Sequence, residues 1–231
     1  TYAARTLYGF FTPTSALGLM FATSAFVALC SGFYNRRALA VTSVALAGFA
    51  PLLTNSPSPD YVGLFWYLLI VVLGAVWIVV WKDFREVVTM ALVVVSLYSL
   101  PVIFDVVRAD QSVLLLFGYA FAAIFYVTTT VGLIRSGKNA SSADLLTALI
   151  NSLFLLAWIY SSAAKDWQSL IIAAWAAVFV VGAFVIFRVS GRKEPFYLYA
   201  AVGAAYLAAA TALELDGAAL TSASLIEASS V

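Results

Sequence analysis

Four acids stand at the ends of long apolar runs or inside one in this 231-residue sequence, and they are the first candidates for chemistry: Glu227, Glu214, Asp216 and Asp105. An ionisable residue inside an apolar run is costly in hydrocarbon and is a functional candidate by default. Glu227 lies well inside the last apolar stretch. If that stretch enters a membrane, Glu227 must be neutral or paired; if it lies on a surface, Glu227 is an ordinary exposed acid. Asp105 has Arg108 at the i+3 position, which favours a solvated ion pair over a site.

Uncharged polar residues offer a second candidate pair. Thr147 and Asn151 are four residues apart within an apolar run, so they share one face of a helix. An asparagine in hydrocarbon seeks a partner on another helix and adds only about 0.6–2 kcal/mol to helix association. We therefore expect this pair to join the helices expected at 111–134 and 143–163, with a substrate site as the less favoured alternative.

The residue types on which most active sites depend are missing from the sequence. It has no histidine, which removes the commonest metal ligand and the commonest general base. Its one cysteine, Cys30, has no partner for a disulfide. All the lysines fall in expected loops, so a retinal Schiff base within a helix is excluded. Phosphate-binding loops, cysteine clusters and paired buried carboxylates are also lacking, and we predict no catalytic residue, no metal site and no cofactor.

The composition is that of a membrane protein. The chain is 64% hydrophobic and 10% charged, whereas soluble domains carry about 25% charged residues. Its net charge of +1 leaves no basic face for nucleic acid. A spanning helix needs about 20 mostly apolar residues. Eight segments approach or exceed this length: 10–33, 38–54, 61–81, 86–104, 111–134, 143–163, 167–187 and 195–213. We expect one all-α domain over residues 1–231, a polytopic transmembrane bundle of four hairpins, with 218–231 as a partial spanning helix or a surface helix.

The lysines and arginines are sorted between alternate loops. Nine of the twelve lie in the odd-numbered loops: Arg36, Arg37, Lys82, Arg85, Arg135, Lys138, Arg188, Arg192 and Lys193. The other side receives only Arg5, Arg108 and Lys165. Because cytoplasmic loops retain lysine and arginine, this pattern predicts a multi-pass protein of the cell membrane with its basic loops in the cytoplasm and its N-terminus outside.

The basic loops also recur at similar intervals. Arg36, Lys82, Arg135 and Arg188 are separated by 46, 53 and 53 residues. The repeating unit would be a helix, a short basic loop and a second helix, present four times in one orientation. Such spacing is compatible with internal duplication, although any series of hairpins shows some regularity.

Two regions resemble a known family of membrane proteins. Within residues 25–100, Leu46–Leu53 ends one helix, Leu64–Leu69 and Leu73–Gly74 lie in the next, and Trp81–Arg85 forms a basic, aromatic turn. Within residues 195–228, the runs Leu215–Gly217 and Leu220–Thr221 precede Glu227. These runs are similar to the DUF2339 family of predicted multi-spanning membrane proteins. The family tends to have tryptophan where this chain has serine at position 224.

The resemblance implies an integral membrane protein, mainly prokaryotic, with no assigned reaction and therefore no catalytic residues to carry over. Members of the family continue with more helices. We therefore expect this chain to be part of a longer protein or a short divergent member, with the lipid bilayer and either other membrane chains or further helices as its partners.

Three functions follow from these observations, in order of preference. The scarcity of ionisable residues in the apolar runs favours a non-catalytic scaffold or interaction subunit. A transporter or flippase for an amphipathic or lipid-linked substrate would use an apolar groove and the acids Glu214, Asp216 and Glu227. A transferase acting on a lipid or glycan at the outer face would need two convergent polar groups, and the sequence does not bring any such pair together.

Overall fold

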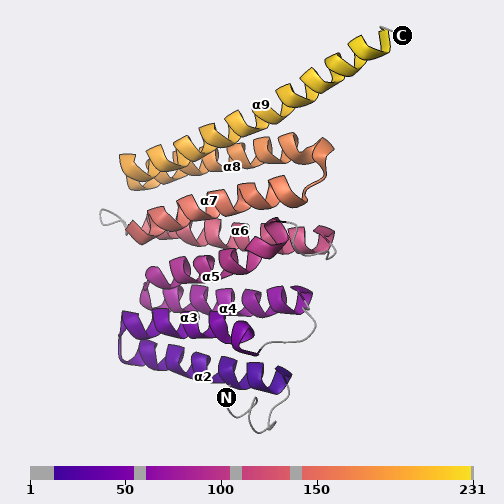
Figure 1. Ribbon diagram of the computed structural model, residues 1–231. Helices are drawn as coiled ribbons and strands as arrows, with labels where there is room; N and C mark the ends of the chain where they lie inside the picture. Colours follow the sequence, from indigo (N-terminus) through magenta and orange to yellow (C-terminus); the bar gives the residue numbers. More distant parts are fainter. Residues whose placement is uncertain (1–12, 55–60, 105–110, 136–141, 230–231) are drawn as a thin grey trace.

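The apolar segments of the chain form helices. The computed structural model describes the backbone of residues 13–54, 61–104, 111–135 and 142–229, and most side chains in these ranges. Across them there are eight α-helices and no strand. Figure 1 shows them as α2 (Pro13–Phe33), α3 (Arg37–Thr54), α4 (Tyr61–Lys82), α5 (Glu86–Ile103), α6 (Gln111–Arg135), α7 (Ser142–Ser162), α8 (Lys165–Ser190) and α9 (Lys193–Ser229). The all-α class expected from the sequence is confirmed.

Most of these helices are long and apolar enough to cross a membrane. Six stretches of the described chain meet that requirement: Tyr61–Lys82, Glu86–Ile103, Val113–Arg135, Ser142–Ser162, Lys165–Ser190 and Lys193–Leu215. The described apolar parts of α2 and α3 are shorter, Phe21–Phe33 and Arg37–Pro51. Large apolar side chains also face outward, among them Trp77 at 67%, Leu116 at 69% and Val181 at 60% exposure. Water-soluble monomers rarely expose apolar surface on this scale, so this surface is suited to lipid.

The C-terminal helix differs from its expected form. The sequence predicts an end to the eighth helix near 213 and a partial spanning or surface helix over 218–231, but α9 continues without a break from Lys193 to Ser229. The sequence after Pro195 is rich in alanine and leucine, which are strong helix formers, and contains no further proline to end the helix. Gly217 is tolerated inside it. In Figure 1 the last part of α9 extends past the other helices.

The helices form two layers, and each hairpin contributes one helix to each layer. Each hairpin pairs an even-numbered helix with the next odd-numbered one: α2 with α3, α4 with α5, α6 with α7, and α8 with α9. Between hairpins, α3, α5, α7 and α9 contact one another in order, and so do α2, α4, α6 and α8. The result is a linear array in which the four hairpins follow chain order (Figure 1). Each hairpin buries its faces against its neighbours, as the units of a solenoid do.

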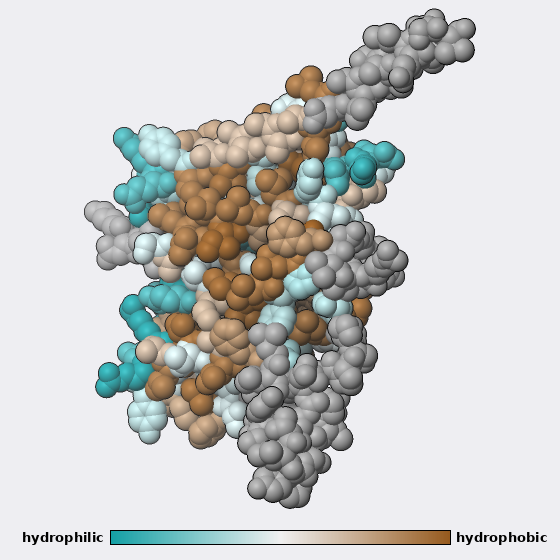
Figure 2. All heavy atoms as spheres, viewed as in Figure 1, coloured by the Kyte–Doolittle hydropathy of each residue, from teal (hydrophilic) through white to brown (hydrophobic). Residues whose placement is uncertain are grey.

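The short turns within the first, second and fourth hairpins lie at the same end of the helices; we call it the basic end. Each of these three turns contains a residue in the left-handed region, Asn35 (φ 52°), Asp83 (φ 59°) and Gly191 (φ 66°). These are the residue types that adopt that conformation at least cost. An arginine follows within two residues each time, at Arg36, Arg85 and Arg192. Figure 2 shows hydrophilic residues gathered at this end and hydrophobic ones over the middle.

Hydrogen bonds to backbone carbonyls tie neighbouring hairpins together. Four of them are donated by tyrosines: Tyr67 to Ala47 O (2.7 Å), Tyr98 to Gly48 O (2.7 Å), Tyr126 to Val178 O (2.8 Å) and Tyr206 to Ser152 O. The first two join the second hairpin to the first, and the last two join the third and fourth. Pro51 explains one of them, because proline has no N–H for the carbonyl four residues earlier and so leaves Ala47 O free.

Candidate functional site between the second and third hairpins

The described polar groups converge most clearly at the basic end, where the second hairpin meets the third. The left-handed Asp83 turns the chain from α4 into α5 and brings its carboxylate back onto Arg85. Arg85 Nε donates to Asp83 Oδ1 at 2.6 Å, and Nη2 bonds the same oxygen. These bonds hold the guanidinium at the N-terminal end of α5. Its side chain is only 10% exposed, whereas that of Asp83 is 71% exposed.

The far side of the same guanidinium reaches the third hairpin. Arg85 Nη1 lies 3.7 Å from Asp144 Oδ1 in the first turn of α7, and the Asp144 side chain is 6% exposed. Gly132 of α6 makes room for this contact, because a Cβ there would lie 1.9 Å from Arg85 Nη1. Asp144 Oδ2 is buried without a hydrogen-bond partner among the described residues. The ion pair of Arg85 and Asp144 therefore links the start of α5 to α7, and it crosses α6 at Gly132, which has no side chain.

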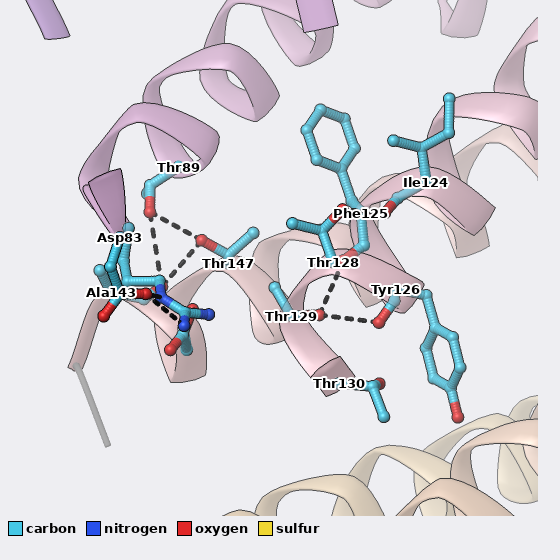
Figure 3. Close-up of polar contacts among 12 residues, drawn as sticks. Asp83, Thr89, Ile124, Phe125, Tyr126, Thr128, Thr129, Thr130, Ala143 and Thr147 are labelled. Atoms are coloured by element: carbon cyan, nitrogen blue, oxygen red, sulfur yellow. Dashed lines mark hydrogen bonds and ion pairs between the residues drawn. The ribbon is translucent and has the colours of Figure 1, made fainter. Parts of the chain in front are cut away.

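Two threonines extend this bridge one turn further into the array. Thr89 Oγ1 of α5 and Thr147 Oγ1 of α7 lie 2.7 Å apart and share a hydrogen bond. Thr147 also donates to Ala143 O at 2.8 Å, and Thr89 reaches the same carbonyl at 3.4 Å. Figure 3 shows Thr89, Ala143 and Thr147 meeting close to Asp83, with the threonines 128–130 of α6 set apart from them.

The contacts of this arrangement join helices of two hairpins. A general acid–base pair needs two groups that both face a reacting atom, but here one guanidinium lies between the two carboxylates and contacts both of them. Within the described ranges there is no group of three histidine, cysteine, aspartate or glutamate residues that could hold a metal ion. The cluster links two hairpins, and it supplies the polar tie that tyrosines supply at the other two interfaces.

A comparison with protein families decides the class of this chain. The sequence profile of DUF2339, described as a predicted membrane protein, matches residues 1–231. The chain belongs to the DUF2339 family. No curated protein and no solved structure matches it. Together with its apolar helices, this membership makes the chain a multi-pass membrane protein, and it confirms the resemblance seen in the sequence.

Of the four acids singled out in this DUF2339 sequence, Glu214 is the one whose side chain the structure describes, and it does not join the cluster of Asp83, Arg85, Asp144, Thr89 and Thr147. Glu214 is exposed on α9, more than twenty residues along the helix from the basic end. Asp216 and Glu227 lie on α9 at positions whose side chains are outside the described part of the chain. Asp105, with Arg108, also lies outside the described residues.

The polar pair of α7 is divided between two neighbours. Asn151 Nδ2 donates to Ala122 O of α6 at 3.0 Å, which is the interhelical bond expected of it. Thr147 instead bonds Thr89 of α5, so the two residues face different helices of the array. Asn151 Oδ1 has no partner among the described residues. Both side chains are buried, and both contribute to helix packing.

The basic residues gather as their spacing suggests, but they differ in environment. Arg36, Arg37, Arg135, Arg188 and Lys193 are exposed at the basic end, and Lys82, Arg85 and Arg192 are partly buried there. Lys138 lies outside the described residues. Arg37 Nη1 lies 3.6 Å from Glu86 Oε1, and Arg192 Nη2 lies 3.2 Å from Glu194 Oε2.

Asp144 was missed as a site residue, because an acid in a first helical turn is usually explained by the helix dipole. Gly132 was missed as well. A glycine inside α6, three residues before Arg135, is the signal that could have indicated a close approach there.

Proposed function

We propose that this chain is a non-catalytic scaffold or interaction subunit of a prokaryotic cell membrane, which packs against itself or against partner membrane proteins. The observation that supports this most is the use made of the buried polar side chains. At each of the three interfaces between hairpins, described polar groups bond the neighbouring hairpin: tyrosines at the first and third, the arginine, aspartate and threonines at the second. Bonds of this kind join hairpins, which is the role that a scaffold requires.

The stacked architecture supports the same proposal. A linear array offers two long faces for partners, and in the described part of the chain each hairpin makes its main contacts with its neighbours in sequence. Exposed apolar side chains cover these faces, including Leu153 at 60% and Phe184 at 61% exposure. Such surfaces suit lipid or the helices of other membrane chains, with small differences in packing deciding between the two.

We expect removal of the acids to leave this function intact. The test is one variant that combines Asp105→Asn, Glu214→Gln, Asp216→Asn and Glu227→Gln. It should reach wild-type levels in the membrane, migrate at wild-type size after mild detergent extraction, and restore the phenotype of a deletion strain. The matched control is Gly48→Leu, because a Cβ at Gly48 would lie 2.5 Å from Val94 Cγ1 and should disturb packing. Normal level and size with loss of the phenotype would contradict the proposal and favour a transporter, flippase or transferase.

We also propose that the basic end faces the cytoplasm, since lysine and arginine are retained there. In a Cys30→Ser background, single cysteines at the exposed positions Arg36, Arg188 and Lys165 report on the two ends. With a membrane-impermeant maleimide, Arg36→Cys and Arg188→Cys should react only after the cells are opened, and Lys165→Cys should react in intact cells. Labelling of Arg36→Cys and Arg188→Cys from opposite sides would contradict the hairpin array in the membrane; labelling of both in intact cells would reverse its orientation.

A further inference from the structure

A groove lies between α4 and α6 at the basic end of the array. It encloses about 590 Å³. Charged residues line one part of the groove, and valines line the rest. Lys82, Arg85 and Arg135 lie at the mouth, where α4 ends, α5 begins and α6 ends. Valines of α4 and α6 line the wall, including Val80, Val127 and Val131. The groove is therefore cationic at the membrane surface and apolar toward the membrane interior.

The mouth keeps a net positive charge, because three cations, Lys82, Arg85 and Arg135, stand against the carboxylates of Asp83 and Asp144. Arg85 is engaged by Asp83 and Asp144. Lys82 and Arg135 form no ion pair with any residue that the structure describes, and the Lys82 ammonium lies 4.6 Å from the centre of the Trp81 ring. Asp83 is the one acid among the lining residues that the structure describes. Lys82 and Arg135, on neighbouring helices and without an acidic partner of their own in the described part of the chain, can thus attract an anion.

The wall of the groove adds a second requirement for the ligand. Val80, Val127 and Val131 are 66%, 57% and 43% exposed, so the groove is open along its side to whatever surrounds the helices. A free phosphate compound would use the two cations but would leave these valines uncovered. A phospholipid satisfies both parts, because its phosphate lies at the membrane surface and its acyl chain runs along the helices.

We propose that this groove binds an anionic phospholipid, with its phosphate between Lys82 and Arg135 and an acyl chain along the valines of α4 and α6. Basic pockets between transmembrane helices recognise anionic headgroups through this combination of charge and apolar wall. The inference goes beyond a scaffold function, which needs no particular lipid.

Native mass spectrometry of the detergent-purified chain tests this assignment, with phosphatidylglycerol, phosphatidylcholine of the same acyl chains, and inorganic phosphate as probes. The wild-type chain should retain phosphatidylglycerol in preference to the other two. Lys82→Gln with Arg135→Gln should weaken that retention about 30-fold, because each basic residue near the surface contributes about a fivefold preference for anionic lipid. Val131→Trp should also weaken the retention of phosphatidylglycerol, because the larger side chain fills the apolar part of the groove and every charge is kept.

The matched control is Arg36→Gln with Arg188→Gln, which removes the same charge from exposed positions at the same end. It should retain phosphatidylglycerol within about twofold of wild type, because those residues are outside the groove. Equal losses in both double variants would overturn the site in favour of general attraction to the basic end. Equal binding of phosphatidylcholine would overturn the role of charge. Competition by inorganic phosphate with no effect of Val131→Trp would overturn the lipid and leave a free phosphate as the ligand.

Discussion

Replacing Trp158 with alanine is expected to lower the free energy of unfolding by about 3 kcal/mol, the lower end of the range for such truncations in soluble cores. Trp158 of α7 is fully buried. Its ring packs edge-on against Phe65 of α4 and lies against Gly118 of α6, where a Cβ would come within 2.8 Å of Trp158 Cδ2. The side chain therefore fills the interface between the second and third hairpins, and alanine would leave a cavity there.

The loss of unfolding free energy expected for Trp158→Ala is at the low end of this range for a physical reason. Lipid chains are as apolar as the core, so burial in a membrane protein gives little transfer free energy, and the loss is mainly of close packing. Reversible unfolding in mixed micelles measures it. Trp77→Ala is the matched control, because Trp77 is 67% exposed on α4 and should change stability by less than about 1 kcal/mol. Equal losses in the two variants would show that Trp158 does not fill the interface described here.

Removing the Asp144 carboxylate is the second change with a large expected effect. Asp144→Ala should lower stability by about 3 kcal/mol, because it leaves the nearly buried Arg85 without its partner on α7. Asp83 still contacts the guanidinium, which keeps the loss toward the lower end of the range for a broken buried pair. The same unfolding titration measures it.

A double variant that replaces both charges with apolar residues separates charge from packing at this position. Arg85→Met combined with Asp144→Leu should recover most of the stability lost in Asp144→Ala, since apolar residues can replace a buried ion pair at little cost. Asp83→Ala is the comparison, because the Asp83 side chain is 71% exposed and should contribute less than about 1 kcal/mol. If the double variant is as unstable as Asp144→Ala, the ion pair itself, rather than relief of an unpaired charge, stabilises the interface.

The local features of this fold were readable from the sequence, and the reason is simple. Long apolar runs ended by charged or turn-forming residues have few alternatives to helices, so segments such as 61–81 and 86–104 closely match α4 and α5. The alternation of basic loops followed from the same segments. The continuous α9 was not foreseen, because Glu214 and Asp216 suggested a surface boundary where the backbone remains helical.

The contacts between hairpins could not be predicted in the same way. Arg85 and Asp144 are far apart in the sequence, and each has a sufficient local explanation, one as a loop cation and the other as a first-turn acid. Pro51 does imply a free carbonyl at Ala47, but not that Tyr67 supplies the donor. Pairing across helices depends on which faces meet, and a surface that is apolar on all sides does not specify those faces.

The uniform orientation of the hairpins also bears on how such an array can change in length. Every hairpin begins and finishes on one side of the array, and its neighbours contact it through equivalent helices. Inserting or deleting a whole hairpin therefore adds or removes an even number of crossings. Parts attached before and after the inserted unit keep their compartments, so an ancestral gene could lengthen or shorten without relocating anything joined to it.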